Sequence, residues 1–237
     1  MIDKYIKESY NMKPSSNGSN KVCYCIDDYV LLKGDFVNDG EEEIIKRDKL
    51  NLLKANGVNV CRVLENTIID NKRYELQVRA KGEELYNYHF SYNLEGQKKY
   101  LSVLNSLSNQ DTQFFKKFIE DWCKILEIGF DVDPSKCSNF FYDGKKITFI
   151  DLNLTNNYAK RAPWILREIA VVLRGGGLLW QCKKVYEDAN EKVKIIYQKI
   201  GEAAIELDYD INELISYIDP NGEYGLKEYF NLSEKSL

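Results

Sequence analysis

The chain has 237 residues, which is enough for one large domain or one two-lobed unit with a buried core. Hydrophobic residues make up 44% of it and charged residues 30%, which excludes a disordered or fibrous chain. The formal net charge is −4, so we expect no general nucleic-acid binding, which requires a basic face.

Neither a secretory signal nor an apolar run of the about 20 residues that cross a bilayer is found in the sequence. We therefore expect no membrane partner and a cytoplasmic location. The six cysteines are scattered, and only Cys23 and Cys25 are close together. Because His89 is the single histidine, the sequence favours free thiols in a reducing compartment over a zinc site.

The first third of the chain predicts an antiparallel sheet with one helix inserted. Residues 21–37 form two β-branched and aromatic runs about Asp27-Asp28, which is typical of a hairpin. A helix is predicted over 41–55, ending at Asn56-Gly57. Two further strands, joined by a polar turn near Asp70-Asn71, are predicted over 58–64 and 74–80.

The character of the chain changes after residue 80. An amphipathic helix is predicted over 111–128, and two short strands, Phe140–Tyr142 and Ile147–Ile150, flank the turn signal Asp143-Gly144. Further helical patterns occupy 162–174, 185–206 and 210–218. The predicted fold class is α+β, with a small sheet-rich lobe over 1–80 and a larger helical lobe over 81–237.

Polar residues in 129–153 are spaced for magnesium chemistry. Asn139 precedes one predicted short strand and Asp151 follows the other, so both would lie at one edge of the hairpin. Mg²⁺ takes a few hard oxygen ligands of this kind beside a polyphosphate. Phosphoryl transfer from ATP also needs a cation on the phosphates and a carboxylate that orients the attacking hydroxyl.

The segment resembles the protein kinase-like superfamily, in particular its aminoglycoside phosphotransferase-like branch. There, Asp-x-x-Pro-x-Asn is followed by a hairpin and Asp-Phe-Gly. The resemblance implies a bilobal kinase-like fold, with Asn139 and Asp151 as the magnesium ligands. The loop is longer than in the family, so either Asp131 or Asp133 can be the catalytic carboxylate; the Asp-Val-Asp-Pro match favours Asp131, and the spacing to Asn139 favours Asp133.

The resemblance extends to the start of the chain. A loop of small residues precedes the hairpin, and Lys33 ends its second strand as the ATP-binding lysine of the family does. The resemblance implies that this loop, with Gly18, Ser19 and Val22, covers the phosphates, although the triple-glycine pattern is absent.

A helical carboxylate usually holds such a lysine. Glu43 is the preferred partner, while Glu42 and Asp48 are rivals, and a helix dipole alone also favours acidic residues there.

Residues 76–85 resemble the hinge between the lobes of those enzymes. The resemblance implies that the backbone of Val78 and Ala80 faces the adenine edge, with Gln77 at the gatekeeper position.

Together these features predict a kinase, with MgATP between the lobes and a small molecule or a protein Ser/Thr as the hydroxyl acceptor. Two alternatives remain open: a pseudokinase that binds nucleotide or a partner without transfer, and an interaction domain in which the motifs are accidental.

Overall fold

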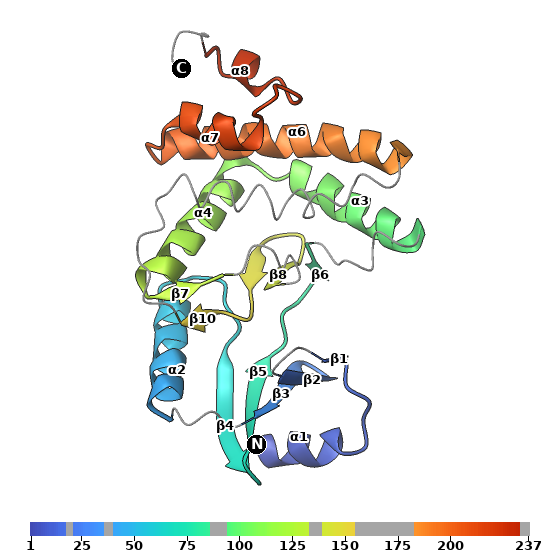
Figure 1. Ribbon diagram of the computed structural model, residues 1–237, viewed down its shortest axis with the longest axis vertical. Coiled ribbons are helices and arrows are strands. Elements are labelled where there is room, and N and C mark those ends of the chain that lie inside the picture. The colour runs from blue at the N-terminus through green and yellow to red at the C-terminus, as the bar shows by residue number, and fades with distance from the viewer. Residues whose placement is uncertain (18–20, 36–39, 86–93, 133–138, 155–182, 233–237) are drawn as a thin grey trace. The chain divides into compact units, whose positions relative to one another are not determined.

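The computed structural model describes residues 1–17, 21–35, 40–85, 94–132, 139–154 and 183–232 (Figure 1). It is a mixed α+β structure made of two compact units, Met1–Lys81 and Gly82–Leu237. The sequence predicts a lobe boundary between residues 80 and 81, one residue from the boundary between these two units. That the units are the lobes of a kinase remains a prediction.

The first unit contains a five-stranded antiparallel sheet with the order β1-β2-β3-β5-β4. Its strands are β1 (Ser16–Asn17), β2 (Lys21–Ile26), β3 (Tyr29–Asp35), β4 (Val63–Ile69) and β5 (Lys72–Val78). The turns lie where the sequence predicts them. Asp27, Asp70 and Asn71 have φ angles of 52°, 49° and 56°, a left-handed conformation that Asp and Asn adopt more readily than other side chains.

The strand predicted over 58–64 is wrong in its bounds, because β4 begins only at Val63. Val58 and Val60 are buried, but they lie in the irregular connection that follows a helix rather than in the sheet. Alternating apolar residues indicate burial of one face of a segment. Here Val58 and Val60 are buried in a packed loop, so the pattern is present without a strand.

That helix is α2 (Gly40–Ala55), close to the predicted range of 41–55. It ends in a Schellman motif: Gly57 has a φ of 75°, and the Val58 N–H donates to the Leu53 carbonyl at 3.0 Å. Leu50 and Leu53 are its buried side chains among those described.

A short helix that the sequence analysis did not predict, α1 (Ile2–Ser9), packs on one face of the sheet. Its apolar residues share a core with residues of β2, β3 and β5: Ile2, Tyr5, Ile6, Ile26, Leu31, Tyr74 and Leu76. The carboxylate of Glu65 on β4 accepts the Ile2 N–H at 2.6 Å and so satisfies a donor that has no partner within the helix.

The second unit is mainly helical. Its helices are α3 (Leu94–Ser108), α4 (Thr112–Glu127), α6 (Lys183–Glu206), α7 (Ile211–Ile218) and α8 (Leu226–Tyr229). The long helix α6 runs beside α3 and α4 (Figure 1). Asp111 and Asp210 cap α4 and α7 by accepting backbone N–H groups, as expected of Asp before a helix. The helix predicted over 162–174 lies outside the described residues.

Phe230, just after α8, packs against Gly201 near the C-terminal end of α6. A side chain at Gly201 would overlap the Phe230 ring, so the glycine leaves the space that the ring occupies.

Two small sheets complete the second unit. One contains β6 (Glu83–Glu84), β8 (Phe140–Tyr142) and β9 (Ile147–Phe149), and the other pairs β7 (Phe130–Asp131) with β10 (Asn153–Leu154). The predicted turn is present between β8 and β9, where Asp143 Oδ1 accepts the Lys145 and Lys146 N–H groups, each at 2.9 Å. None of the described helices is long and apolar enough to cross a membrane.

Candidate active site

Aromatic rings hold the β8–β9 hairpin of the second unit in place. Phe140 and Phe149 face each other across the hairpin, with ring centroids 5.5 Å apart. From α4, Trp122 lies 5.2 Å from Phe140, and Phe118 lies 5.4 Å from Phe149. All four side chains are buried. Packed aromatic side chains of this size contribute several kcal/mol each, so the hairpin is firmly positioned.

The open end of this hairpin carries two of the predicted site residues. Asn139 directly precedes β8, and its carbonyl accepts the Ile150 N–H at 2.9 Å. Asp151 is the next residue after Ile150, so the backbones of Asn139 and Asp151 lie side by side. The sequence analysis predicted this proximity from the spacing of the two short strands.

A second pairing adds Asp131 to the same region. In the β7–β10 ladder Asp131 lies opposite Asn153, which is two residues after Asp151. Three of the predicted residues, Asp131, Asn139 and Asp151, are therefore brought together by backbone hydrogen bonding. Asp133, the alternative catalytic carboxylate, lies outside the described residues.

Asn139 is buried with its hydrogen-bonding capacity incompletely used. Its side chain is 5% exposed, and its Nδ2 group is the one fully buried side-chain N or O atom without a partner in the described part of the chain. An unpaired buried donor costs about 1–3 kcal/mol, so it calls for an explanation. A hydrogen-bond acceptor on a ligand, such as a phosphate oxygen, would satisfy this donor, whereas a metal ion would bind the amide oxygen instead.

Asp151 has an unusual backbone conformation. Its φ angle is 51°, and its side chain is exposed between the half-buried Ile150 and the buried Leu152. Asp adopts this left-handed conformation more readily than most residues, as Asp27 and Asp70 do in the turns of the first unit. Both Asp131 and Asp151 take part in interactions within the protein.

The donor set fits magnesium better than a softer metal. Asn139 and Asp151 offer amide and carboxylate oxygens, and Mg²⁺ needs few protein ligands because it keeps several waters. Among the described residues there is no group of three or more His, Cys, Asp or Glu side chains that could hold a metal by themselves. The two oxygen donors would therefore require water or a phosphate to complete a coordination shell.

In the first unit, Lys33 lies near the end of β3. It is opposite Val22 on β2 and Tyr74 on β5 in the sheet, and its Nζ atom is 5.6 Å from the centre of the Tyr74 ring. Tyr74 belongs to the core that α1 covers. Lys33 is thus on the α1 face of the sheet.

A buried carboxylate that the sequence analysis missed lies on the opposite face. Glu75 on β5 is 5% exposed; it pairs with Arg73 at 2.6 Å and accepts a short hydrogen bond from Gln77. Burial raises the Glu75 pKa, but the charge of Lys46 on α2 and the bonds from Arg73 and Gln77 outweigh burial and hold the pKa below its usual value. The signal was present as three polar residues at alternate positions of one strand.

The predicted hinge residues are partly engaged within the first unit. The Val78 N–H donates to the Arg62 carbonyl at 3.0 Å, and Gln77 is tied to Glu75. Burial raises the pKa of the Cys61 thiol to about 11, although Lys54 and a hydrogen bond from the Ala80 backbone oppose that rise.

Several predicted residues cannot be placed. Gly18 and Ser19 lie outside the described residues, and so do the side chains of Glu42 and Glu43 on α2.

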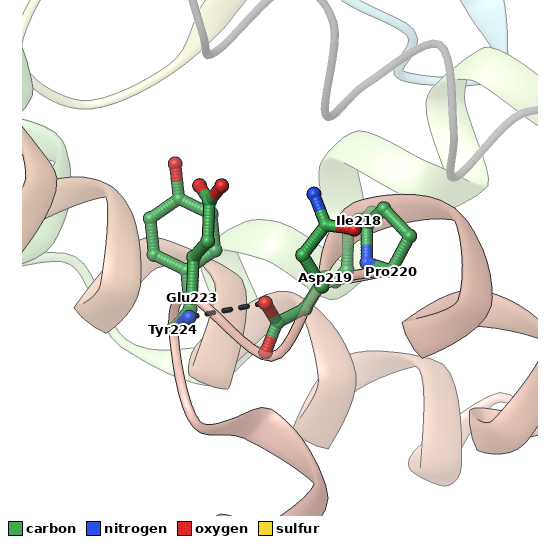
Figure 2. A pocket seen from close by; sticks show the side chains of 6 residues that line it. Ile218, Asp219, Pro220, Glu223 and Tyr224 are labelled. Atoms are coloured by element: carbon green, nitrogen blue, oxygen red, sulfur yellow. Dashed lines mark hydrogen bonds between the residues drawn. The ribbon is translucent and has the colours of Figure 1, made fainter.

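The second unit also has a small pocket beside α7, with a volume of about 30 Å³ (Figure 2). Its lining residues are Ile218, Asp219, Pro220, Asn221, Glu223 and Tyr224. The buried Asp219 carboxylate accepts the N–H groups of Tyr224 and Leu226, each at 3.0 Å. The space suits one or two waters and is too small for a nucleotide, so Asp219 serves to fix the loop before α8.

No model of a known protein family and no curated protein sequence matches this chain.

Proposed function

We propose that the chain is an ATP-dependent phosphotransferase with a bilobal, protein kinase-like fold. It would transfer the γ-phosphoryl group of MgATP to a hydroxyl group of a small molecule or of a protein Ser/Thr. The observation that carries the proposal is the convergence of Asp131, Asn139 and Asp151 through two backbone pairings of the second unit. These are the residue types that phosphoryl transfer needs beside the nucleotide.

Each residue of this group has a separate task in the proposal. Asn139 and Asp151 would hold Mg²⁺, which when bound neutralises charge on the phosphate oxygens. Asp131, or Asp133 in the alternative assignment, would accept a hydrogen bond from the acceptor hydroxyl and orient it for in-line attack. Such catalysis relies on orientation and electrostatics, so few side chains are required.

The buried, unpaired Nδ2 group of Asn139 supports a phosphate beside this residue, because its N–H groups can donate to phosphate oxygens while the amide oxygen would face Mg²⁺. A purely structural asparagine at 5% exposure would be expected to use both ends of its amide. The rigid aromatic packing around β8–β9 also suits a site in which small displacements reduce the rate.

The organisation of the first unit is compatible with the proposal. Strand β1 precedes the β2–β3 hairpin, and Lys33 lies near the end of β3. Lys33 is the lysine that the family resemblance implies for the phosphates, and this role remains a prediction.

The test measures nucleotide binding and turnover in the same full-length preparation. Binding is followed by the thermal unfolding midpoint with ATP and Mg²⁺, and turnover by phosphate release and by the intact mass of the chain. We expect Asp151→Asn to lose the Mg²⁺-dependent part of binding and about 100-fold or more of turnover. Asp131→Asn should lose turnover and keep the nucleotide.

Asparagine is chosen at position 151 because it also adopts positive φ angles. Asp208→Asn is the matched control, since Asp208 is an exposed aspartate of the second unit with a φ of 61° and has no role in the proposed site. The proposal fails if the wild type shows no ATP turnover, or if Asp131→Asn and Asp151→Asn both retain it. Binding without turnover in the wild type would identify the pseudokinase alternative.

A further inference from the structure

The short strand β6 holds the edge of the strand that follows Asn139. In the second unit β6 runs antiparallel to β8, with Glu83 opposite Tyr142 (Figure 1). Beyond the strand, the Leu85 N–H donates to the Phe140 carbonyl at 2.8 Å. Because Phe140 is the next residue after Asn139, the hydrogen bonds of this segment reach the residue beside the proposed magnesium ligand.

Gly82, directly before β6, lies very close to the backbone of β8. Its φ angle is 94°, which glycine adopts without strain. A Cβ atom at this position would overlap the carbonyl group of Tyr142 and would lie 2.6 Å from the Asp143 Cα atom. These are backbone atoms, and they cannot rotate away as the end of a flexible side chain can. The pairing of β6 with β8 therefore requires glycine at position 82.

Both strands are also fixed by other contacts of the second unit. On the β6 side, Leu85 is 2% exposed and Glu83 forms an ion pair with Lys99 on α3. On the β8 side, the Tyr142 hydroxyl accepts a hydrogen bond from Gln110 Nε2 at 2.7 Å. A side chain at position 82 therefore has no free space to enter, and it would have to push β6 and β8 apart.

The pairing with β6 complements the aromatic packing of the β8–β9 hairpin. Phe140 and Tyr142 contact rings of α4, with centroids 5.2 Å from Trp122 and 5.8 Å from Phe114. Apolar packing is not directional and tolerates small shifts along the strand, whereas backbone hydrogen bonds set a strand's register. The position of Asn139 along the strand direction therefore depends on β6.

We propose that Gly82 is a positioning residue for the phosphotransferase reaction: it allows β6 to fix β8, and β8 holds the Asn139 amide where its oxygen can bind Mg²⁺. This inference rests on the proposed function. Gly82 acts through the strand pairing and has no chemical task of its own. A displacement of about 1 Å in such a site can cost about 100-fold in rate, so a fixed strand register is needed.

The test titrates the full-length chain with MgATP by calorimetry, which reports the affinity and the fraction of binding-competent chains separately. Gly82→Ala should weaken MgATP binding at least fivefold at an unchanged stoichiometry. A merely structural role would instead lower the stoichiometry by unfolding part of the sample, and the folded fraction would keep its affinity. Gly144→Ala is the matched control, because Gly144 has a φ of 90° in the same hairpin and no atom lies within 4 Å of an added Cβ. It should bind within twofold of the wild type.

If circular dichroism shows that Gly82→Ala is unfolded, Lys99→Ala decides. It releases Glu83 at an exposed ion pair and should weaken MgATP binding about threefold, whereas Lys98→Ala, at the neighbouring exposed lysine, should not.

The inference is overturned if folded Gly82→Ala loses less than fivefold in affinity, or if Lys99→Ala, as the deciding variant, binds like Lys98→Ala. The proposed function then still stands, provided that the wild type binds and turns over MgATP and Asp151→Asn does not. Absence of MgATP binding by the wild type would overturn both.

Discussion

Asn139 in the second unit and Glu75 in the first are equally buried, each with 5% of its surface exposed, but their surroundings differ. Glu75 receives two hydrogen bonds, from Arg73 and Gln77 of its own strand, and the charge of Lys46 helps to lower its pKa. Asn139 has a buried amide nitrogen without a partner among the described residues. Burial alone therefore does not identify a binding residue. A buried polar group without a hydrogen-bond partner indicates a position where a ligand can bind.

The two residues are also held in place by different kinds of surrounding structure. Asn139 is held at the end of a hairpin by aromatic rings, and Glu75 is held in the central strand of a sheet by polar neighbours. Disturbing either framework should have a large effect, and changing the residue itself should have a large effect only for Glu75.

Trp122→Ala should have the largest effect on stability. It removes a fully buried ring that contacts both strands of the β8–β9 hairpin, and such changes cost about 3–5 kcal/mol. Guanidinium denaturation followed by circular dichroism measures the loss. Phe114→Ala, at a half-buried position of the same helix, is the control, and equal losses would contradict the assigned role of Trp122.

Glu75→Ala should follow, with a loss of about 3 kcal/mol in the first unit. Breaking a buried ion pair leaves the partner charges uncompensated, and the partly exposed Arg73 keeps the cost at the low end of the usual range. The same denaturation experiment tests it. A loss no larger than that of Asp48→Ala, at an exposed position of α2, would show that Glu75 is not an organising group.

The contribution of Glu75 should depend on pH. Because its pKa is lowered in the folded chain, its stabilisation is present above the pKa of an unfolded glutamate and is lost as the pH falls through the folded value. The difference in unfolding free energy between the wild type and Glu75→Gln should therefore shrink from pH 7 to pH 3. A difference that stays constant or grows on acidification would exclude this linkage.

Asn139→Leu should have the smallest effect on stability, a change of less than about 1 kcal/mol in either direction. The substitution removes an unsatisfied donor and keeps a similar side-chain shape. Asp219→Ala is the contrasting variant, because it leaves two buried N–H groups without their acceptor and should cost about 2 kcal/mol or more. If Asn139→Leu costs as much as Asp219→Ala, the amide has a structural role.

Local sequence signals predicted the parts of the fold that depend on neighbouring residues. Asp27, Asp70 and the Asn56-Gly57 pair mark turns and a helix end because those residues tolerate left-handed backbone. The proximity of Asn139 and Asp151 followed in the same way, since one short hairpin joins them. The helix α1 was missed although Ile2, Tyr5 and Ile6 have helical spacing, because eight residues give a weak pattern.

The remaining features depend on packing between segments far apart in the chain. Lys33 and Glu75 fall on opposite faces of the sheet, and their alternation along the strands is evident from the sequence. The sequence does not show which face of the sheet α1 covers, because α1 lies about 60 residues or more from β5 in the chain. The same reason explains why Val58 and Val60 are buried outside the sheet.

The contact between Phe230 and Gly201 makes the surface of α6 depend on the C-terminal segment. The hollow that Gly201 leaves on α6 is filled by a ring 29 residues further along the chain. A chain that stopped short of Phe230 would therefore expose that hollow, and exposed apolar surface of this kind promotes association between chains.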